Sequence, residues 1–378
     1  MNKRALIEKA IQGEEVDEIP WTIYRSLLPW GEKEFKFRTD GLGLIYEGFP
    51  VCNSQVLNIE IIDKIEYIFR DNQKKDVINR QFSTPLGSLD IIYEHPIDSL
   101  PQLSDIPSRF ANSDVMQREL SWITKFPFRD KADYEKIEFI YNSTKHVPIN
   151  EEYIKIDSII GNEGLVMLNG GRSPFSLMLF SLMGYEKCYI EYHSNRKRFL
   201  KFFDFLYHKS REQYMLASKS SAIIVWCPDN ITSGLIPPYI FKDYFIPFYN
   251  DVAEILHKSG KVLAVHMDGT LKTLVDLIKE TKIDIIEAFT PPPMGDLRVS
   301  EARKKWQDKV LWINFPGTLI ASGDFKNIKN YTEKLVRDMY PAKKFLVGFT
   351  ENFPLDKWST SFEAISEVLD KPGNSDIR

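Results

Sequence analysis

The sequence has few cysteines and no long apolar segment. Its three cysteines, Cys52, Cys188 and Cys227, are odd in number and show no CxxC spacing, which is typical of reduced thiols rather than of a disulfide framework. No run approaches about 18 apolar residues, and the N-terminal MNKRALIEKAIQGEEVDEIPW becomes acidic where a signal peptide needs an apolar stretch. We therefore expect a cytoplasmic protein that neither crosses a membrane nor is exported.

An excess of positive charge is also absent. The chain has 49 basic and 53 acidic residues and a formal net charge of -4, so it lacks the basic footprint that nucleic-acid binding requires. Its 25 Phe, 17 Tyr and 7 Trp residues are enough to fill a large core. Although 378 residues exceed an average domain, barrel enzymes often reach this length with insertions. Residues 1–378 are therefore predicted to form a single domain.

The second half of the chain alternates short apolar runs with longer segments of helical period. This arrangement is typical of repeated βα units and predicts a parallel sheet. A seventh strand is predicted at Ile19–Tyr24, and the eighth is not evident in the stretch that follows. The predicted fold is an α/β protein, a (β/α)8 TIM barrel. The six strands of the second half are predicted at Glu163–Leu168, Ala222–Cys227, Lys261–His266, Ile283–Phe289, Val310–Phe315 and Lys344–Phe349.

The stretch between the first strand and these units has a different pattern. Residues 56–95 contain four short strand-like runs, including VLNIEII, KIEYIF and SLDIIYEH, and the turn residues STPLG precede the last. This pattern predicts an antiparallel β-meander inserted in the N-terminal half of the barrel, over roughly residues 50–110, as a cap or lid. The Pro- and Ser-rich segment 95–110 is predicted to be a loop that returns to the barrel.

Polar residues follow nearly every predicted strand, at the end where a parallel barrel gathers its active site. In HMDG, strand alternation puts His266 and Asp268 on one side, about 7 Å apart, and Glu351 after the last strand offers a third ligand. A His with two carboxylates suits Zn²⁺ in an open site, although Fe(II) and Mn²⁺ accept the same set. Such residues are also common as structural histidines and helix caps.

Three segments carry a resemblance to a known family. They are the opening GEEVDEIPW, the closing GFTENFP and, from Asp229 to Gly269, DNITSGLIPPYIFKDYFIPFYNDVAEILHKSGKVLAVHMDG. In these segments the chain resembles the uroporphyrinogen decarboxylase superfamily, in which an Asp-containing loop precedes a Pro-bearing helix, a Gly turn and a strand ending in His-x-x-Gly. The resemblance covers most of the chain and implies the same barrel fold.

The site residues resemble one branch of that superfamily, the corrinoid-linked zinc methyltransferases. A true decarboxylase carries an Arg-rich QAGRY-type segment, whereas this chain has IYRSLLPWGEKEF, in which Arg25 matches one arginine and the rest of the motif is missing. In the methyltransferase branch the metal ligands are His-x-Cys and a second Cys near the final strand. His266 matches the His, while Asp268 and Glu351 stand where the cysteines would be. Because both replacements are themselves zinc ligands, the resemblance implies a retained zinc site.

The change from thiolates to carboxylates predicts a specific activity. Carboxylates leave the ion harder and more electrophilic than thiolates do, which favours an oxygen atom of the substrate. We therefore expect O-demethylation of a methoxylated aromatic compound, with transfer of the methyl group to Co(I) of a corrinoid protein that docks at the barrel mouth.

Further residues are assigned to this predicted site. The resemblance implies that Asp229 and Asn230 lie near the reacting centre as catalytic, orienting groups. Substrate contacts are predicted for the aromatic residues Trp226, Tyr239 and Phe289, which are equally consistent with packing in the core, and for Asn314.

Other functions remain open from the sequence alone. Within the same branch, the chain could transfer methyl groups between a methylcorrinoid and tetrahydrofolate or another acceptor. Outside it, a metal-free decarboxylase or lyase would use Asp229 and Asp268 as acid and base. A protein without catalytic activity would use the barrel only to bind a partner. The assembly state is also open, with a homodimer as one candidate. The fold does not decide among these functions.

Overall fold

The computed structural model describes residues 1–16, 18–70, 73–96, 122–339 and 342–369, which form two compact units. The first unit consists of Met1–Phe49, Glu151–Leu168 and the described part of Ser221–Arg378. The second consists of the described part of Pro50–Asn150 together with Asn169–Ser220. The grouping of both units into a single domain stays a prediction.

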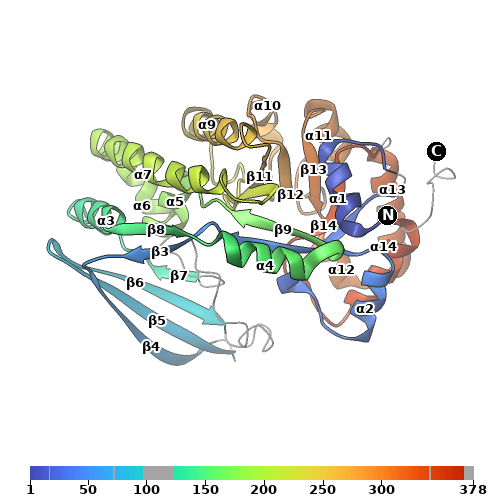
Figure 1. Cartoon of the computed structure of the whole chain (residues 1–378), viewed down its shortest axis with the longest axis horizontal. Helices are drawn as coiled ribbons and strands as arrows, with labels where there is room; N and C mark the ends of the chain where they lie inside the picture. Colours follow the sequence, from blue (N-terminus) through green and yellow to red (C-terminus); the bar gives the residue numbers. More distant parts are fainter. Residues whose placement is uncertain (17, 71–72, 97–121, 340–341, 370–378) are drawn as a thin grey trace. The chain divides into compact units, whose positions relative to one another are not determined.

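Eight parallel strands close into a barrel in the first unit, which confirms the predicted (β/α)8 fold (Figure 1). All seven strands predicted from the sequence are present, with ends that differ by one or two residues. Around the barrel the strand order is β1-β14-β13-β12-β11-β10-β9-β2. The strands are β1 Trp21–Tyr24, β2 Gly43–Pro50, β9 Gly164–Asn169, β10 Ile224–Cys227, β11 Val262–His266, β12 Ile285–Phe289, β13 Val310–Asn314 and β14 Phe345–Phe349.

The eighth strand, β2, was not recognised in the sequence because its composition is unusual for a strand. The segment GLIYEGFP contains two glycines, a proline and Glu47, all of which are depleted in strands. Seven of its eight residues are nevertheless buried, because both faces of a barrel strand are covered. Its pairing with β1 aligns Tyr24 with Ile45 and closes the barrel.

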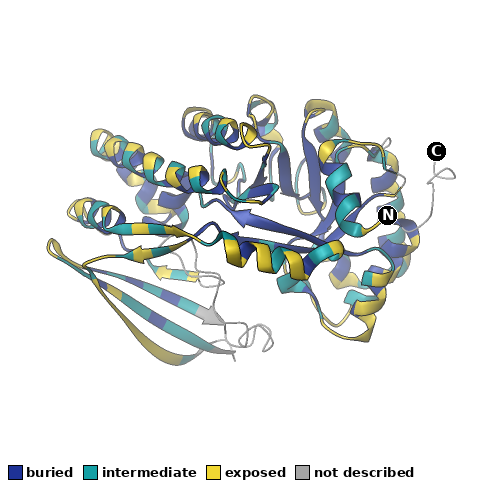
Figure 2. Ribbon diagram, viewed as in Figure 1, coloured by how far each residue is buried: buried dark blue, intermediate teal, exposed yellow. Residues whose placement is uncertain are grey.

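Apolar side chains fill the barrel interior, and Figure 2 shows its strands as buried. Helix α1, Lys3–Gln12, packs Ile7, Ala10 and Ile11 on this interior cluster. The helix begins where the Asn2 side chain accepts a hydrogen bond from the Ala5 amide and ends at Gly13, whose φ of 78° is left-handed. The strand residues of the cluster are Tyr24, Ile45, Leu165, Met167, Ile224, Ala264, Ile285, Val310, Trp312 and Leu346.

The remaining helices of the first unit mostly follow its strands. The predicted helices after β10, β11, β12, β13 and β14 are all present. Three others were not predicted: α2 after β1, α4 before β9 and the short α12 directly after β13. Apart from α1, the helices of the first unit are α2 Glu32–Thr39, α4 Asn150–Ile160, α8 Pro238–Ile240, α9 Ile246–His257, α10 Val275–Lys279, α11 Val299–Lys305, α12 Gly317–Ser322, α13 Phe325–Met339 and α14 Trp358–Leu369.

The second unit contains two antiparallel sheets (Figure 1). The larger has the strand order β4-β5-β6-β7, and β3 pairs with β8 in the smaller. The predicted meander is therefore present, but as three long strands rather than four short ones, joined by β7 from beyond residue 110. Residues 97–110 of the predicted return loop lie outside the described residues. The strands are β3 Cys52–Val56, β4 Glu60–Arg70, β5 Gln73–Thr84, β6 Gly87–Pro96, β7 Trp122–Lys125 and β8 Thr144–Pro148.

Helices supply the rest of the second unit. Helix α3 buries Tyr134, Ile137 and Ile140 and contacts the larger sheet at β5 and β6. The role of this sheet as a cap or lid stays a prediction. The helices of the unit are α3 Asp133–Asn142, α5 Pro174–Leu177, α6 Tyr185–Ser194 and α7 Arg196–Ala217, with a π-helical turn at Met178–Leu182.

The structure also bears on the state of the cysteines and on membrane-spanning helices. Cys52, Cys188 and Cys227 are all buried and free of disulfides, as expected. Among the helices of the described residues, none is long and apolar enough to cross a membrane.

Candidate metal centre

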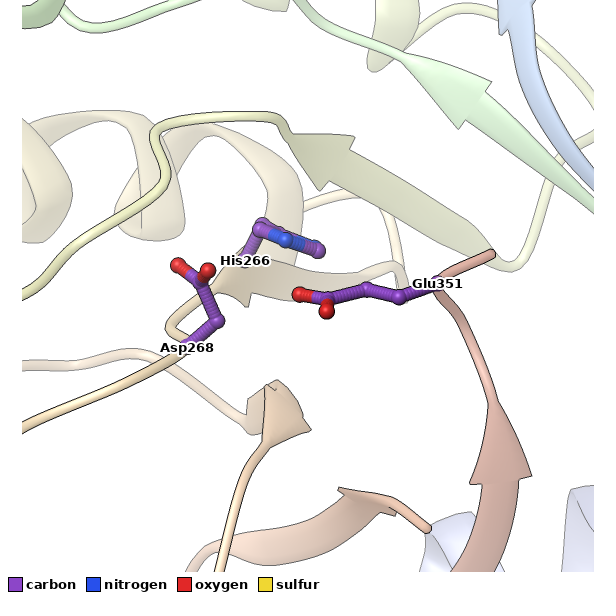
Figure 3. Close-up of side chains that lie close together, drawn as sticks. All are labelled: His266, Asp268 and Glu351. Atoms are coloured by element: carbon purple, nitrogen blue, oxygen red, sulfur yellow. The ribbon is translucent and has the colours of Figure 1, made fainter. Parts of the chain in front are cut away.

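The three predicted metal ligands lie together at the C-terminal ends of two barrel strands. His266 ends β11, Asp268 follows it by two residues, and Glu351 follows β14 by two residues. One potential ligand atom from each of the three lies within 4.8 Å of the other two. Figure 3 shows the three side chains converging from two elements that are more than 80 residues apart in sequence.

A buried glutamate that the sequence analysis missed holds His266 in place. The Glu287 side chain, from β12, is fully buried, and its Oε2 lies 2.8 Å from Nδ1 of His266. The carboxylate also accepts hydrogen bonds from the Tyr24 hydroxyl at 2.7 Å and from Nε1 of Trp226 at 2.9 Å. Because a carboxylate accepts the Nδ1 proton, Nε2 of His266 is the nitrogen at which a metal ion can replace a proton.

An irregularity in β12 separates Glu287 from the next predicted site residue. Against β13, Ile286 pairs with Leu311 but Phe289 pairs with Ile313, so β12 has one extra residue, and Ala288 has a left-handed φ of 58°. A shift of one residue reverses the side to which the following side chain points. Phe289 accordingly packs on the Trp306 ring beyond helix α11 and is fully buried, so its position does not favour the predicted substrate contact.

The electrostatics of the three residues favour a cation between them. Burial alone would lower the pKa of His266, but Glu287, with smaller contributions from Asp268 and Glu351, raises it to about 9. Burial, followed by repulsion from Asp268, raises the pKa of Glu351 above its ordinary value. Two carboxylates this close repel one another, and a proton or a metal ion relieves the repulsion.

The donor set fits a divalent metal ion. Oδ1 of Asp268 is buried and accepts no hydrogen bond from the described residues, which is costly for a carboxylate that holds no cation. Nε2 of His266 is available, and carboxylate and imidazole are ordinary zinc ligands. Donors on one Zn²⁺ lie about 3.5 Å apart, because Zn–N and Zn–O distances are about 2.1 Å. Small side-chain rotations would bring the three donors to that spacing.

Comparison with known proteins identifies the family. The sequence pattern of the uroporphyrinogen decarboxylase (URO-D) family matches residues 115–367, which is more than half of the chain. The chain belongs to the URO-D family. No curated protein sequence matches it significantly.

A solved structure shares the fold of this URO-D family member at low sequence identity. A methyltransferase from Methanosarcina mazei is 12% identical, and the match covers 98% of each chain with a TM-score of 0.57. At this identity the likeness shows the fold alone. A sugar phosphate isomerase/epimerase from Parabacteroides distasonis, also 12% identical, matches 59% of this chain and 76% of its own with a TM-score of 0.27, which carries no argument.

The remaining predicted substrate residues of this URO-D family member lie in three different settings. Trp226 is half-buried beside the triad, and its ring stands edge-on to that of His266 with centroids 5.9 Å apart. Asn314 is buried at the end of β13, where its Oδ1 accepts a hydrogen bond from the Thr350 amide at 3.2 Å. Tyr239 lies on α8 and is 48% exposed. Substrate contact by these residues stays a prediction.

The loop after β10 carries the two predicted catalytic residues. Asp229 is fully buried, and its Oδ2 accepts a hydrogen bond from the Tyr249 hydroxyl at 2.6 Å. Asn230 has a left-handed φ of 51°, and the next amide, of Ile231, donates to the carbonyl of His266 at 3.0 Å. The loop is thus tied to the backbone of a triad residue, while catalysis by Asp229 and Asn230 stays a prediction.

Glu47 is a second acidic residue that the sequence analysis missed. It lies on β2 two residues beyond Ile45 of the interior cluster, so strand alternation directs it into the barrel. Its Oε1 accepts a hydrogen bond from the Ser26 hydroxyl and one from the Ser26 amide at 3.3 Å. Burial nevertheless raises the pKa of Glu47 from 4.5 to about 7, because these hydrogen bonds offset only part of the desolvation.

Replacing Glu47 by Gln is expected to stabilise the fold in a pH-dependent way. A carboxyl whose pKa is higher in the folded than in the unfolded chain stabilises the fold fully below pH 4.5, and this contribution is lost as the pH rises to about 7. Glu47→Gln should therefore raise the free energy of unfolding by on the order of 2 kcal/mol at pH 8 and by little at pH 5. Urea unfolding at both pH values measures the difference.

A surface carboxyl provides the control for this prediction. Glu363 lies on the exposed side of α14, so Glu363→Gln should change stability little at either pH. An equal gain from Glu47→Gln at pH 5 and pH 8 would contradict the explanation, because the effect would then not depend on ionisation.

Proposed function

We propose that this chain is a zinc-dependent methyltransferase that removes the methyl group of an aryl methyl ether and passes it to Co(I) of a corrinoid protein. The observation that carries the proposal is the convergence of His266, Asp268 and Glu351 at the barrel mouth, on a barrel of the URO-D family. The match to a chain described as a methyltransferase is consistent with this class of reaction.

In this proposal, His266 would hold the zinc ion through Nε2, and Asp268 and Glu351 through one carboxylate oxygen each. When bound, the ion would supply a Lewis acid at the ether oxygen of the substrate. Glu287 keeps the His266 proton on Nδ1 and orients the ring through its short contact. The three ligands would leave a fourth position open to substrate.

The bond changes of the proposed reaction balance without a further reactant. The bond between the methyl carbon and the ether oxygen breaks, and its electron pair stays on the oxygen, giving a phenolate. The methyl group forms its new bond with the electron pair that Co(I) of the partner supplies. The protein has to stabilise the negative charge that develops on the oxygen, and a carboxylate-ligated ion, being harder than a thiolate-ligated one, suits that task.

Trp226 is the residue that would meet the aromatic ring of the substrate. Its Nε1 is held by Glu287, and its six-membered ring lies 3.5 Å from the position that a Cβ on Gly48 would take. The indole is therefore held on two sides, and a fixed aromatic wall beside the metal ligands would orient a planar substrate and keep water from the reacting bond.

The first test is the metal content of the purified protein and of His266→Ala and Glu351→Ala. The proposal predicts close to one zinc per chain in the wild type and loss of at least about tenfold in affinity in each variant, because two ligands bind far more weakly than three. Inductively coupled plasma mass spectrometry measures the content. Asn352→Ala, at the neighbouring position and without a predicted ligand role, serves as the matched control and should keep its zinc.

Either of two results would overturn the proposal. A wild-type protein that binds no metal after dialysis against zinc would leave the metal-free decarboxylase as the stronger candidate. Undiminished zinc in both variants would place the ion elsewhere. If zinc is bound as predicted, a reduced corrinoid protein and a set of methoxylated aromatic compounds then test the substrate class.

A further inference from the structure

Strand β4 is an exposed edge of the larger sheet in the second unit. It runs from Glu60 to Arg70 and pairs only with β5 in the described sheet, so its outer backbone groups have no strand partner there. Residues 60–67 are all exposed, and Figure 2 shows this strand largely in the colour of exposed residues. At about 3.4 Å per residue an 11-residue strand is about 37 Å long, which is long for an unprotected edge.

One face of this exposed edge presents large apolar side chains, although the strand also carries charged residues. Ile61 is 40% exposed, Ile65 is 53% exposed and Tyr67 is 64% exposed. These three residues lie on one face of the sheet, the face on which Ile78 and Phe82 of β5 are buried. Natural proteins normally blunt such edges, because a flat apolar edge pairs with another strand.

The sequence of β4 is self-complementary in the antiparallel direction. We propose that β4 pairs with β4 of a second copy of this chain about a two-fold axis at Ile65. This register places Lys64 opposite Glu66 of the partner subunit, Ile62 opposite the partner's Ile68, and Ile65 opposite the partner's Ile65. Two ion pairs, related by symmetry, and a central apolar contact result.

The charged residues have no competing partner in the sheet itself. In the ladder with β5, Lys64 lies opposite Asn79 and Glu66 opposite Val77, so neither faces an opposite charge. The neighbouring registers are disfavoured, since centring the axis on Lys64 or on Glu66 puts like charges directly opposite each other. Of the registers centred on Lys64, Ile65 and Glu66, the one centred on Ile65 avoids like charges opposite each other, and it also pairs Glu60–Arg70 along its full length.

The resulting assembly would join two four-stranded sheets into one sheet of eight strands. About ten backbone hydrogen bonds form between two antiparallel strands of this length. A two-fold contact of this kind is self-limiting, because pairing occupies the β4 edge of the described sheet in both copies and leaves no β4 edge for a third copy. This inference concerns the second unit and is independent of the proposed metal centre.

A charge-reversal cycle tests the interface. Lys64→Glu alone and Glu66→Lys alone each put two like-charge pairs across the axis, and each should raise the dimer dissociation constant by about tenfold or more. The double variant Lys64→Glu/Glu66→Lys restores two opposite-charge pairs and should return the constant to within about threefold of the wild type. Sedimentation velocity over a range of protein concentrations measures all four proteins.

Each outcome of the cycle either supports or overturns the proposal. Because both side chains are exposed, the circular dichroism spectra of the three variants should be unchanged, which excludes misfolding as the cause. A monomeric wild type overturns the interface. A dimer that both single variants leave intact places the contact elsewhere, and a double variant that stays dissociated rules out the register centred on Ile65.

Discussion

A variant that carries both Asp268→Cys and Glu351→Cys is expected to keep its zinc but to demethylate aryl methyl ethers about 100-fold more slowly. The substitutions restore the thiolate ligands that the sequence resemblance associates with this branch of the family. Thiolates bind zinc at least as well as carboxylates do, but they donate more charge to the ion and weaken it as a Lewis acid. A loss of about 2.7 kcal/mol in stabilisation of the developing phenolate corresponds to a 100-fold lower rate.

Metal analysis measures whether the cysteine variant keeps its zinc. Single-turnover experiments with a reduced corrinoid protein measure its rate of demethylation. The control is Asp268→Glu, which keeps an oxygen ligand and should lower the rate less than the thiolate pair does. A cysteine variant that retained both zinc and the full demethylation rate would show that the carboxylates are not what suits this site to ethers.

Replacing Glu287 by Gln is expected to weaken zinc binding by about 10- to 100-fold, the usual effect of losing a carboxylate behind a metal-bound histidine. The amide has no negative charge to support the Nδ1 proton of His266, and its NH₂ group, if turned toward Nδ1, would fix the wrong tautomer. Competition with a chromophoric chelator measures the zinc affinity directly, without an activity assay.

A second variant, Tyr24→Phe, distinguishes a role of Glu287 in positioning His266 from a general loss of packing around Glu287. Tyr24→Phe removes one hydrogen bond to the same carboxylate but leaves its charge and its contact with His266, so it should weaken zinc binding much less than Glu287→Gln. If the two variants bound zinc equally well, Glu287 would have no role in positioning His266.

The barrel was predictable from the sequence because its strands are short apolar runs separated by helical segments. Strand β2 was not predicted, because Glu47 and two glycines interrupt its apolar pattern. Its pairing with β1 in the folded barrel shows that it is a strand. The three-stranded core of the meander was underestimated for a related reason. Alternating charged residues in β4 and β5 look like several short runs, although each forms one continuous ladder.

The three predicted metal ligands could be selected from the sequence because each lies at the end of an apolar run or two residues after it, and the structure brings the three side chains together. Glu287 was missed because it lies within the apolar run IIEAF and was treated as part of a strand. A charged residue inside such a run is itself a signal, since glutamate is almost never fully buried without partners. The same reasoning would have singled out Glu47. The partners themselves, Tyr24 and Trp226, lie 263 and 61 residues from Glu287 along the chain and could not be inferred.

The extra residue in β12 also affects how this chain should be aligned with distant relatives. At 12% identity, the Methanosarcina mazei structure offers few matching letters to guide an alignment, so the alternation of inward and outward positions becomes the main guide. That alternation changes phase at Ala288. An ungapped alignment to a strand without the irregularity would pair every inward residue after this point with an outward one. A one-residue gap at this position is therefore needed in an alignment with any relative whose strand lacks the extra residue.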